Sequence, residues 1–147
     1  MSTLLDTNVL SELLRSIPDA TVVDWFSVQP DESLFVSAVT QAEMMLGARL
    51  MPAGKRRSAL AHNIAAMFEQ DFAGRILPFD SAAVASYVDI VSSRRATGRP
   101  ISQFDAQIAA IAQSHKLKLA TRNMQDFDNC GLALVDPWQQ VAPRRPR

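Results

Sequence analysis

Apolar and polar residues alternate along the chain in two kinds of segment. Short apolar runs, typical of buried strands, lie at residues 3–5, 33–36, 75–79, 117–121 and 133–135. Longer segments that repeat apolar residues at helical spacing lie at residues 9–14, 22–28, 39–50, 56–72, 81–96 and 102–115. Strands that alternate with helices form parallel sheets. The pattern therefore predicts an α/β fold, a three-layer α/β/α sandwich with a central parallel five-stranded sheet.

Turn-forming residues separate these segments without forming a linker between domains. Pro52 and Gly54 separate two of the predicted helices, and Gly74 follows the second of them as a C-cap. A chain of 147 residues has the common length of one domain. We therefore assign residues 1–140 to one domain and expect the basic tail, residues 141–147, to be disordered.

Composition excludes several classes of protein. Hydrophobic residues make up 48% of the chain, which is enough to form a core without cross-links. The single cysteine, Cys130, and the two histidines exclude a disulfide framework and a zinc finger. No stretch approaches the ~20 apolar residues of a membrane span, and Asp6 and Glu12 interrupt the region where a signal peptide is apolar. We therefore expect a cytoplasmic protein that does not enter a membrane.

Charge is balanced over the whole chain but uneven along it. The formal net charge is zero, which argues against a uniformly basic surface for nucleic acid. Two stretches, residues 44–68 and 90–104, nevertheless carry only basic charges. Their basic residues are Arg49, Lys55, Arg56, Arg57, Arg94, Arg95 and Arg99. We treat these residues as candidate contacts for RNA phosphates, with ordinary solvated surface charge as the alternative.

Four acidic residues stand far apart in the sequence, near places where a predicted strand gives way to a helix. They are Asp6, Glu43, Asp105 and Asp126. Carboxylates that converge after folding repel one another unless a divalent cation binds them, so this placement predicts a metal site. Each acid also has a structural alternative. Asp6 and Asp126 could each cap a helical turn, and Ser102 with Asp105 matches a capping box.

Helical spacing favours the metal site over capping for two of the acids. Asp105 shares a helix face with Ile101, Ile108, Ala109 and Ala112, and Glu43 shares one with Val39, Leu46 and Leu50. We therefore expect both carboxylates to face inward, where an acid is rare unless it is paired or metal-bound. Neither stripe contains a basic partner. Parallel sheets bind ligands at the carboxyl ends of their strands, near which all four acids fall.

Polar residues next to the acids are candidates for orienting them. Thr7, Asn8 and Thr121 are placed for hydrogen bonds that hold the carboxylates in position. The segment after Thr121 leaves two possibilities open for the fourth acidic position of the predicted metal site. Asp126 takes it as a ligand, or the neutral Asn123 orients a metal-bound water there.

Six segments follow one another in an order that is more specific than any of them alone. They are LLDTNVLSEL, SAVTQAEMMLGARL, FAGRILPFD, DAQIAAIA, LATRN and VDPW. In this order they resemble the PIN-domain ribonucleases, specifically the VapC and FitB-like toxins of type II toxin–antitoxin pairs. The resemblance implies strand order 3-2-1-4-5, a homodimer, and Mg²⁺ or Mn²⁺ as cofactor for hydrolysis of RNA phosphodiester bonds. It also implies a cognate antitoxin of the VapB or FitA kind, in a heterotetramer or larger assembly, that can place an arginine in the acidic site.

The residues are compatible with this chemistry. Carboxylate-held Mg²⁺ can activate water near neutral pH and neutralise the transition state without a histidine. We assign Asp6 and Asp105 as the principal ligands, with Glu43 and Asp126 completing the set directly or through water, and one carboxylate accepting the water's proton. An antitoxin helix would bind in an apolar groove. Each apolar residue that could line such a groove could instead belong to the ordinary hydrophobic core. Candidate groove residues are Leu10, Leu13, Trp25, Phe26, Met44, Met45 and Met51.

Three other interpretations remain open on the sequence alone. A haloacid-dehalogenase-like phosphatase also begins with a strand and an aspartate, but it requires a second aspartate where this chain has Asn8. A receiver domain would need Asp80 as phosphoacceptor, with Lys116 or Lys118 nearby. The third is a PIN-like fold that serves as a non-catalytic binding or dimerisation module. The presence of the four acidic residues argues against this third interpretation.

Overall fold

Five short parallel strands form the central sheet of the structure, a computed structural model that describes residues 1–139. They are β1 (Thr3–Leu5), β2 (Leu34–Ser37), β3 (Ile76–Leu77), β4 (Lys118–Ala120) and β5 (Leu134–Val135). Their order in the sheet is β3-β2-β1-β4-β5, and every neighbouring pair is parallel. This confirms the predicted sheet and strand order. The predicted disordered tail, residues 141–147, lies outside the described residues.

In the described part of the chain, six helices connect and cover these strands. They are α1 (Thr7–Leu13), α2 (Ala20–Ser27), α3 (Ala38–Arg49), α4 (Lys55–Ala66), α5 (Ser81–Ala96) and α6 (Gln103–Ser114). Three shorter helical segments complete the secondary structure. They are the 3₁₀ helices η1 (Asp31–Ser33) and η3 (Met124–Phe127) and the π-helix η2 (Met67–Asp71). The helix predicted over residues 56–72 is α4 continued by η2. No helix within residues 1–139 is long and apolar enough to span a membrane.

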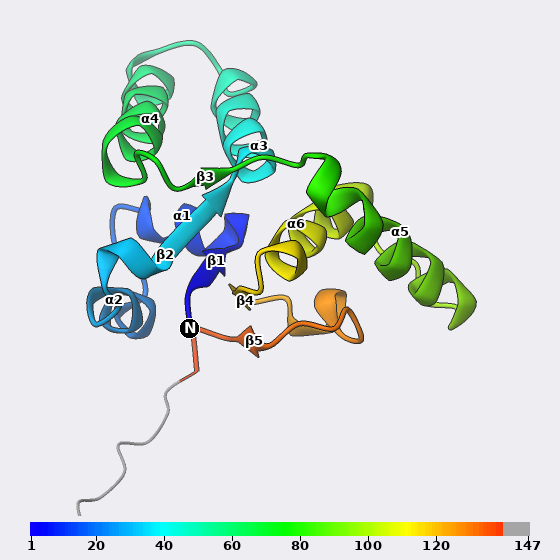
Figure 1. Ribbon diagram of the computed structural model, residues 1–147. Coiled ribbons are helices and arrows are strands. Elements are labelled where there is room, and N and C mark those ends of the chain that lie inside the picture. Colours follow the sequence, from blue (N-terminus) through cyan, green and yellow to red (C-terminus); the bar gives the residue numbers. More distant parts are fainter. Residues whose placement is uncertain (140–147) are drawn as a thin grey trace, which may run out of the picture.

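The sheet separates two hydrophobic cores, because successive side chains of a strand point to opposite faces. Leu5 packs with α1, α2 and α4 on one face, whereas Leu4 packs with α5 and α6 on the other. In β2, Leu34 and Val36 belong to the first core and Phe35 contacts the second. Figure 1 shows the resulting layers, with α5 and α6 on the right of the sheet, α2 on the left and α1 behind β2. The predicted α/β/α sandwich is therefore confirmed.

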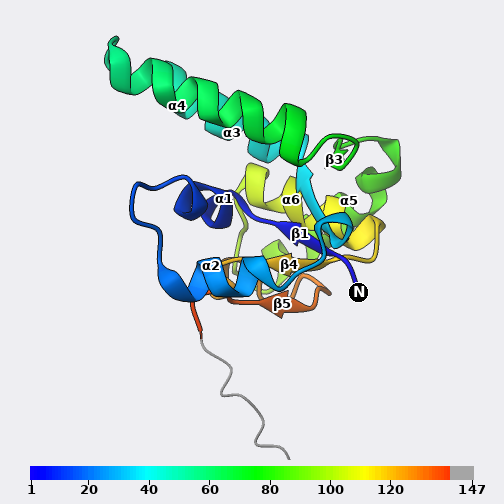
Figure 2. The same ribbon diagram turned by 90° about the vertical axis from the view of Figure 1, so that its left-hand side faces the viewer.

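Helices α3 and α4 lie side by side as a hairpin at one end of the molecule (Figure 2). The buried residues of α3 are Thr40, Met44 and Ala48, which recur every fourth residue. The prediction of an inward stripe that runs from Glu43 to Leu46 and Leu50 is wrong. Leu46 and Leu50 are 57% and 75% exposed, because only the opposite side of this peripheral helix meets the core. Glu43 lies half-buried at the border of the two sides.

Candidate active site

Asp6 follows the central strand β1 at the point where the strand order reverses between β1 and β4. Its backbone N–H donates to the Ala120 carbonyl at 2.9 Å, which fixes the residue to β4. Carboxylate Oδ1 accepts the Thr7 backbone N–H at 2.8 Å, and Oδ2 accepts the Thr121 hydroxyl at 2.8 Å. Asp6 therefore does cap α1 with one oxygen, and the other is held from β4. The side chain is only 4% exposed.

Thr7 connects Asp6 to Glu43. Its hydroxyl donates to Glu43 Oε1 at 2.9 Å and lies 3.0 Å from the Thr40 hydroxyl. Glu43 stands on α3, whose first turn is capped by the Ser37 side chain at the end of β2. The carboxyl ends of two neighbouring strands thus bring Asp6 and Glu43 to one edge of the sheet, with Thr7 between them.

Thr121 is the centre of a second set of hydrogen bonds around Asp6. Besides donating to Asp6, its fully buried hydroxyl accepts from Asn8 Nδ2 at 3.4 Å and from the Asn123 backbone N–H at 3.0 Å. Asn8 Oδ1 in turn accepts the Arg122 backbone N–H at 3.4 Å. Asn123, the residue considered for orienting a metal-bound water, takes part in this set only through its backbone N–H.

Asp105 lies in the first turn of α6, and its backbone N–H donates to the Ser102 side-chain oxygen at 3.2 Å. This bond is one half of the predicted capping box. The carboxylate is half-buried, and the residues that share its face, Ile108, Ala109 and Ala112, are buried. The prediction that the Asp105 face of α6 packs on the sheet is therefore confirmed.

Asp126 lies in η3 and is exposed, but a buried arginine holds its backbone. Arg94 of α5 donates through Nη1 to the carbonyls of Asp126 and Asp128, both at 2.9 Å, and through Nε to that of Arg99 at 2.6 Å. Its side chain is 5% exposed. Arg94 therefore fastens the end of α5 to the segment that carries Asp126. The sequence shows only an arginine in a basic run, with no signal that it is buried.

The four acids form one electrostatic group. Burial raises the pKa of Asp6 to about 6, and the charges of Asp105 and Glu43 add to the increase, although the hydrogen bonds from Thr121 and Thr7 oppose it. Burial also raises the pKa of Asp105. The charge of Asp126 adds to that increase, whereas the Ser102 hydrogen bond and the Arg94 charge oppose it. The charge of Asp6 thus interacts with those of Glu43 and Asp105, and the charge of Asp105 interacts with that of Asp126.

This acidic group does not form a closed cage. Among residues 1–139, no three Asp, Glu, His or Cys side chains lie close enough together to hold one ion directly. The ion pairs found in the same part of the chain, Arg15–Glu12 and Arg99–Asp128, include none of the four acids. Mg²⁺ usually binds through one or two carboxylates and keeps several waters. The four carboxylates here are spread apart and form no ion pairs with basic side chains of residues 1–139. This arrangement fits Mg²⁺ better than it fits a metal ion whose ligands must all come from the protein.

A family model described as "PIN domain" matches residues 3–130, a span that includes all four acids. The chain belongs to the PIN domain family. This match rules out the phosphatase interpretation of Asp6 and the receiver-domain interpretation of Asp80, because phosphatases and receiver domains of these kinds have other folds.

Relatives of this PIN domain align over nearly its whole length. It is 41% identical over 135 residues to the VapC ribonuclease Y4jK of Sinorhizobium fredii, covering 92% of this chain and 96% of that protein. It is also 41% identical to the toxin FitB of Neisseria gonorrhoeae, covering 92% and 97%. The crystal structure of FitAcB from Neisseria gonorrhoeae has a TM-score of 0.85 at 40% identity, covering 94% and 99% of the two chains.

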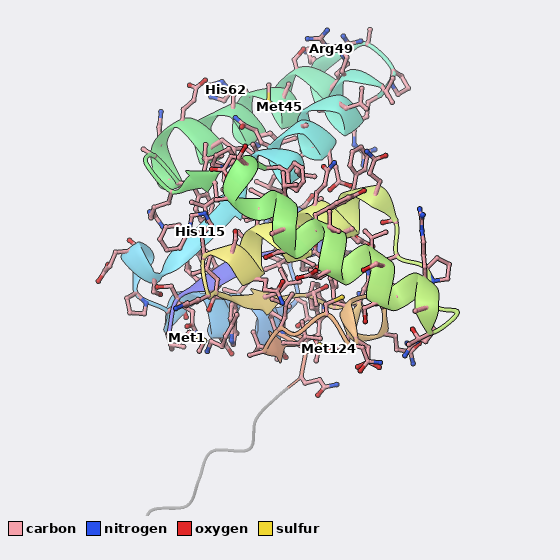
Figure 3. The ribbon with its side chains drawn as sticks, turned by 45° about the vertical axis from the view of Figure 1, so that its right-hand side comes forward. Met1, Met45, Arg49, His62, His115 and Met124 are labelled. Atoms are coloured by element: carbon pink, nitrogen blue, oxygen red, sulfur yellow. The ribbon has the colours of Figure 1, made fainter. Side chains whose placement is uncertain are left out.

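The basic residues of this PIN domain lie in separate places. Figure 3 shows Arg49 at the α3–α4 hairpin and Met124 of η3 at the opposite end of the molecule. Arg99 lies near η3, because it pairs with Asp128, the residue after that turn, at 3.2 Å. The side chains of Arg49, Lys55, Arg56, Arg95 and Arg99 are exposed, and that of Arg57 is half-buried. Arg94 requires a correction. It cannot serve as the predicted phosphate contact in this structure, because it is buried and its guanidinium already donates to three carbonyls.

The raised pKa of Asp6 gives this PIN domain a testable pH dependence. Folded Asp6 keeps its proton up to a pKa of about 6, whereas the ordinary value is 3.8. Between these values the folded state binds more protons than the unfolded state, so the Asp6 contribution to stability is present at low pH and falls as pH rises. A shift of about two units corresponds to a loss of about 3 kcal/mol between about pH 4 and pH 7.

The measurement is urea unfolding in the presence of a chelator across this pH range, with Asp6→Asn as the matched variant. The wild type is expected to lose more unfolding free energy than Asp6→Asn as the pH rises. Parallel curves for the two proteins contradict the assignment of a raised pKa to Asp6.

Proposed function

We propose that this chain is a metal-dependent endoribonuclease and the toxin of a type II toxin–antitoxin pair. The observation that carries the proposal is the buried Asp6 carboxylate at the switch point of a PIN-domain sheet, beside Glu43 and Asp105. Relatives that align over nearly the whole chain support the activity, since one is named a VapC ribonuclease and another the toxin FitB. Because its substrate is RNA, we place the active protein in the cytoplasm.

The donor set supports Mg²⁺ or Mn²⁺ as the cofactor. Asp6 and Asp105 would be the principal ligands, with Glu43 and Asp126 binding directly or through water. All four donors are carboxylate oxygens, the ligand type that these hard cations prefer. When bound, the cation supplies Lewis-acid chemistry and a more acidic water near neutral pH.

The side chains of the chain itself orient the reaction. Thr7 and Thr121 hold one oxygen of Asp6 each, so the carboxylate cannot rotate away from the sheet edge. Thr7 also fixes Oε1 of Glu43, which makes Glu43 the carboxylate placed to accept a proton from the attacking water. The basic residues other than Arg94, namely Arg49, Lys55, Arg56, Arg57, Arg95 and Arg99, would contact RNA phosphates. No catalytic histidine or cysteine takes part in this scheme.

A cleavage assay with controlled metal content tests the proposed activity. Purified protein is expected to cleave total RNA with millimolar Mg²⁺ or Mn²⁺ and to lose this activity in excess chelator. Its melting temperature should rise with added Mn²⁺, because an ion that binds only the folded state stabilises it by mass action. Cleavage that is insensitive to chelator contradicts the metal site. Wild-type protein that binds a partner but cleaves no RNA supports the non-catalytic module instead.

The expected antitoxin groove divides into several places in the structure. Leu10 and Met44 are buried core residues, and Trp25 packs against the same core. Leu13 and Phe26 line a pocket of about 760 Å³ between α1, α2 and the end of α4. Met45 lines a different pocket, between α3 and α4. We therefore place the apolar segment of the antitoxin in the pocket lined by Leu13 and Phe26.

Substituting Val23 tests this placement. Val23 is 37% exposed on α2 and lines the pocket, so a glutamate there should bury a charge against the antitoxin. Val23→Glu is expected to weaken antitoxin binding by about 10-fold or more, since each 1.4 kcal/mol changes affinity tenfold. Val28, 76% exposed at the end of the same helix and outside the pocket, provides the matched control Val28→Glu. Equal affinities of the two variants for the antitoxin, measured by titration, contradict the placement.

Exposed apolar side chains on two helices support a homodimer. They are Met45, Leu46 and Leu50 on or beside α3 and Val84 and Val88 on α5. Groups of large exposed apolar residues are typical of protein interfaces. Light scattering of the purified chain should give the mass of a dimer, and a heterotetramer or larger assembly with antitoxin. A monomer at high concentration contradicts this part of the proposal.

A further inference from the structure

A polar pocket adjoins the candidate active site on the side of η3. Its volume is about 400 Å³, and its lining includes Arg122, Asn123, Gln125, Asp126, Asp136 and Gln139. The segments that follow β4 and β5 supply all of these residues, so the pocket opens at the carboxyl ends of those strands. Two of its residues, Asn123 and Asp126, are also residues of the candidate site. A molecule bound at the acids would therefore extend directly into this pocket.

Arg122 is held in a defined position at this pocket. Its guanidinium carbon lies 5.0 Å from the centre of the Trp138 ring. Its backbone N–H donates to Asn8 Oδ1, and the Trp138 backbone N–H donates to Asp136 Oδ1 at 2.9 Å. Both partners in the stack are thus tied at the backbone. An arginine that stacks on an aromatic ring keeps its N–H edge free for a planar or anionic partner.

Within residues 1–139, Arg122 forms no ion pair with an acidic side chain. The arginines that do form ion pairs there are Arg15 and Arg99. Arg122 is exposed, so its charge is available to a ligand. The amides of Gln125 and Gln139 provide donors and acceptors at the same pocket. A cation, a stacking surface and two amides are the groups that recognise one nucleotide of single-stranded RNA.

We propose that this pocket binds the RNA nucleotide next to the scissile bond, with Arg122 contacting its phosphate and the two glutamine amides contacting its base. This inference rests on the proposed ribonuclease function and adds a substrate subsite to it. Arg122 lies outside the two basic stretches of the sequence, so the charge pattern did not single it out. Only the fold brings Trp138 and Asp136 beside it.

RNA binding tests the subsite without cleavage if every variant also carries Asp6→Asn. Arg122→Gln is compared with Lys116→Gln, an equal loss of charge at an exposed residue in the turn before β4. Figure 3 shows the neighbouring His115 well away from Met124. The probe is a short labelled single-stranded RNA of mixed sequence, and fluorescence anisotropy is recorded over a series of salt concentrations in chelator.

Arg122→Gln is expected to weaken binding by about 10-fold and to reduce the slope of log K against log salt by about 0.7, the value for one lost phosphate contact on a single strand. Lys116→Gln is expected to change neither quantity measurably. Arg122→Lys should fall between, because it keeps the charge but loses the planar stack. An unchanged slope in Arg122→Gln, or the same change in Lys116→Gln, overturns the inference.

Cleavage kinetics separate failure of the subsite from failure of the proposed function. In the otherwise wild-type chain, Arg122→Gln should raise KM by about 10-fold and leave kcat within about 2-fold, because a contact to a phosphate that does not react acts on ground state and transition state alike. If the wild type cleaves RNA and Arg122→Gln has the same KM, the subsite is wrong and the ribonuclease stands. If the wild type cleaves no RNA under any metal condition, both are overturned.

Discussion

Replacing Asp6 by asparagine is expected to lower the rate of RNA cleavage by at least about 10²-fold while the chain still folds. The variant keeps the shape of the side chain. Its amide oxygen can accept the Thr7 N–H. Its NH₂ group can donate to the Thr121 hydroxyl only in place of the long 3.4 Å bond from Asn8, because that hydroxyl already accepts from Asn8 and from the Asn123 N–H. What disappears is the negative charge that interacts with both Glu43 and Asp105. Repulsion with Glu43 and Asp105 also disappears, so the metal-free variant should be at least as stable as the wild type near neutral pH.

Two further variants make this result specific. Asp105→Asn should cause a comparable loss, since Asp105 is, like Asp6, an acid whose pKa is raised by burial. Asp89→Asn removes an exposed acid from the middle of α5 and should cleave RNA like the wild type. The rates are measured on one RNA substrate with saturating Mg²⁺, together with melting temperatures. Near wild-type cleavage by Asp6→Asn means that the acidic group is not the active site.

The sequence predicts most of this fold because its local and overall patterns agree. Asp6 ends an apolar run and precedes a helical repeat, and in the structure it stands between β1 and α1. Asp105 repeats with Ile108, Ala109 and Ala112, and those residues are buried as expected. Where a helix packs over its full length on the sheet, as α6 does, the spacing of apolar residues identifies the buried face.

The same reasoning fails for α3. Leu46 and Leu50 are apolar and correctly spaced, yet both are exposed. Spacing shows that a helix has an apolar face, but it does not show whether that face meets its own core or another protein. The real core contacts of α3, Met44 and Ala48, lie on the next row of the helix. Glu43 reaches the site because Thr7 hydrogen-bonds to it, which no helical pattern predicts.

Arg94 shows why part of the site cannot be predicted from charge alone. In the sequence it is one of three arginines between Asp89 and Asp105. In the structure it is buried, because a later segment of the chain folds over the end of α5. The two carbonyl acceptors in that segment, those of Asp126 and Asp128, lie 32 and 34 positions after Arg94 in the sequence. Burial of a charged side chain depends on such long-range acceptors, which pair the guanidinium and compensate for its lost hydration.

Replacing Arg94 by methionine is therefore expected to destabilise the protein by about 3 kcal/mol or more, because loss of one partner leaves buried polar groups unpaired. Methionine fills much of the same space, but it leaves the carbonyls of Asp126, Asp128 and Arg99 without their donor. Arg94→Lys should recover only part of the loss, because one ammonium group cannot reproduce the fork of a guanidinium.

Urea unfolding in chelator measures this effect, with Arg95→Met as the control. Arg95 is the exposed neighbour on α5, so its loss should change the unfolding free energy by less than about 0.5 kcal/mol. Similar unfolding midpoints for Arg94→Met and Arg95→Met would mean that the Arg94 hydrogen bonds contribute little to stability. In the folded fraction of Arg94→Met, the segment that carries Asp126 has lost its attachment to α5. Cleavage per folded molecule should therefore also fall, because positioning of the fourth acid depends on a residue that does not itself touch the substrate.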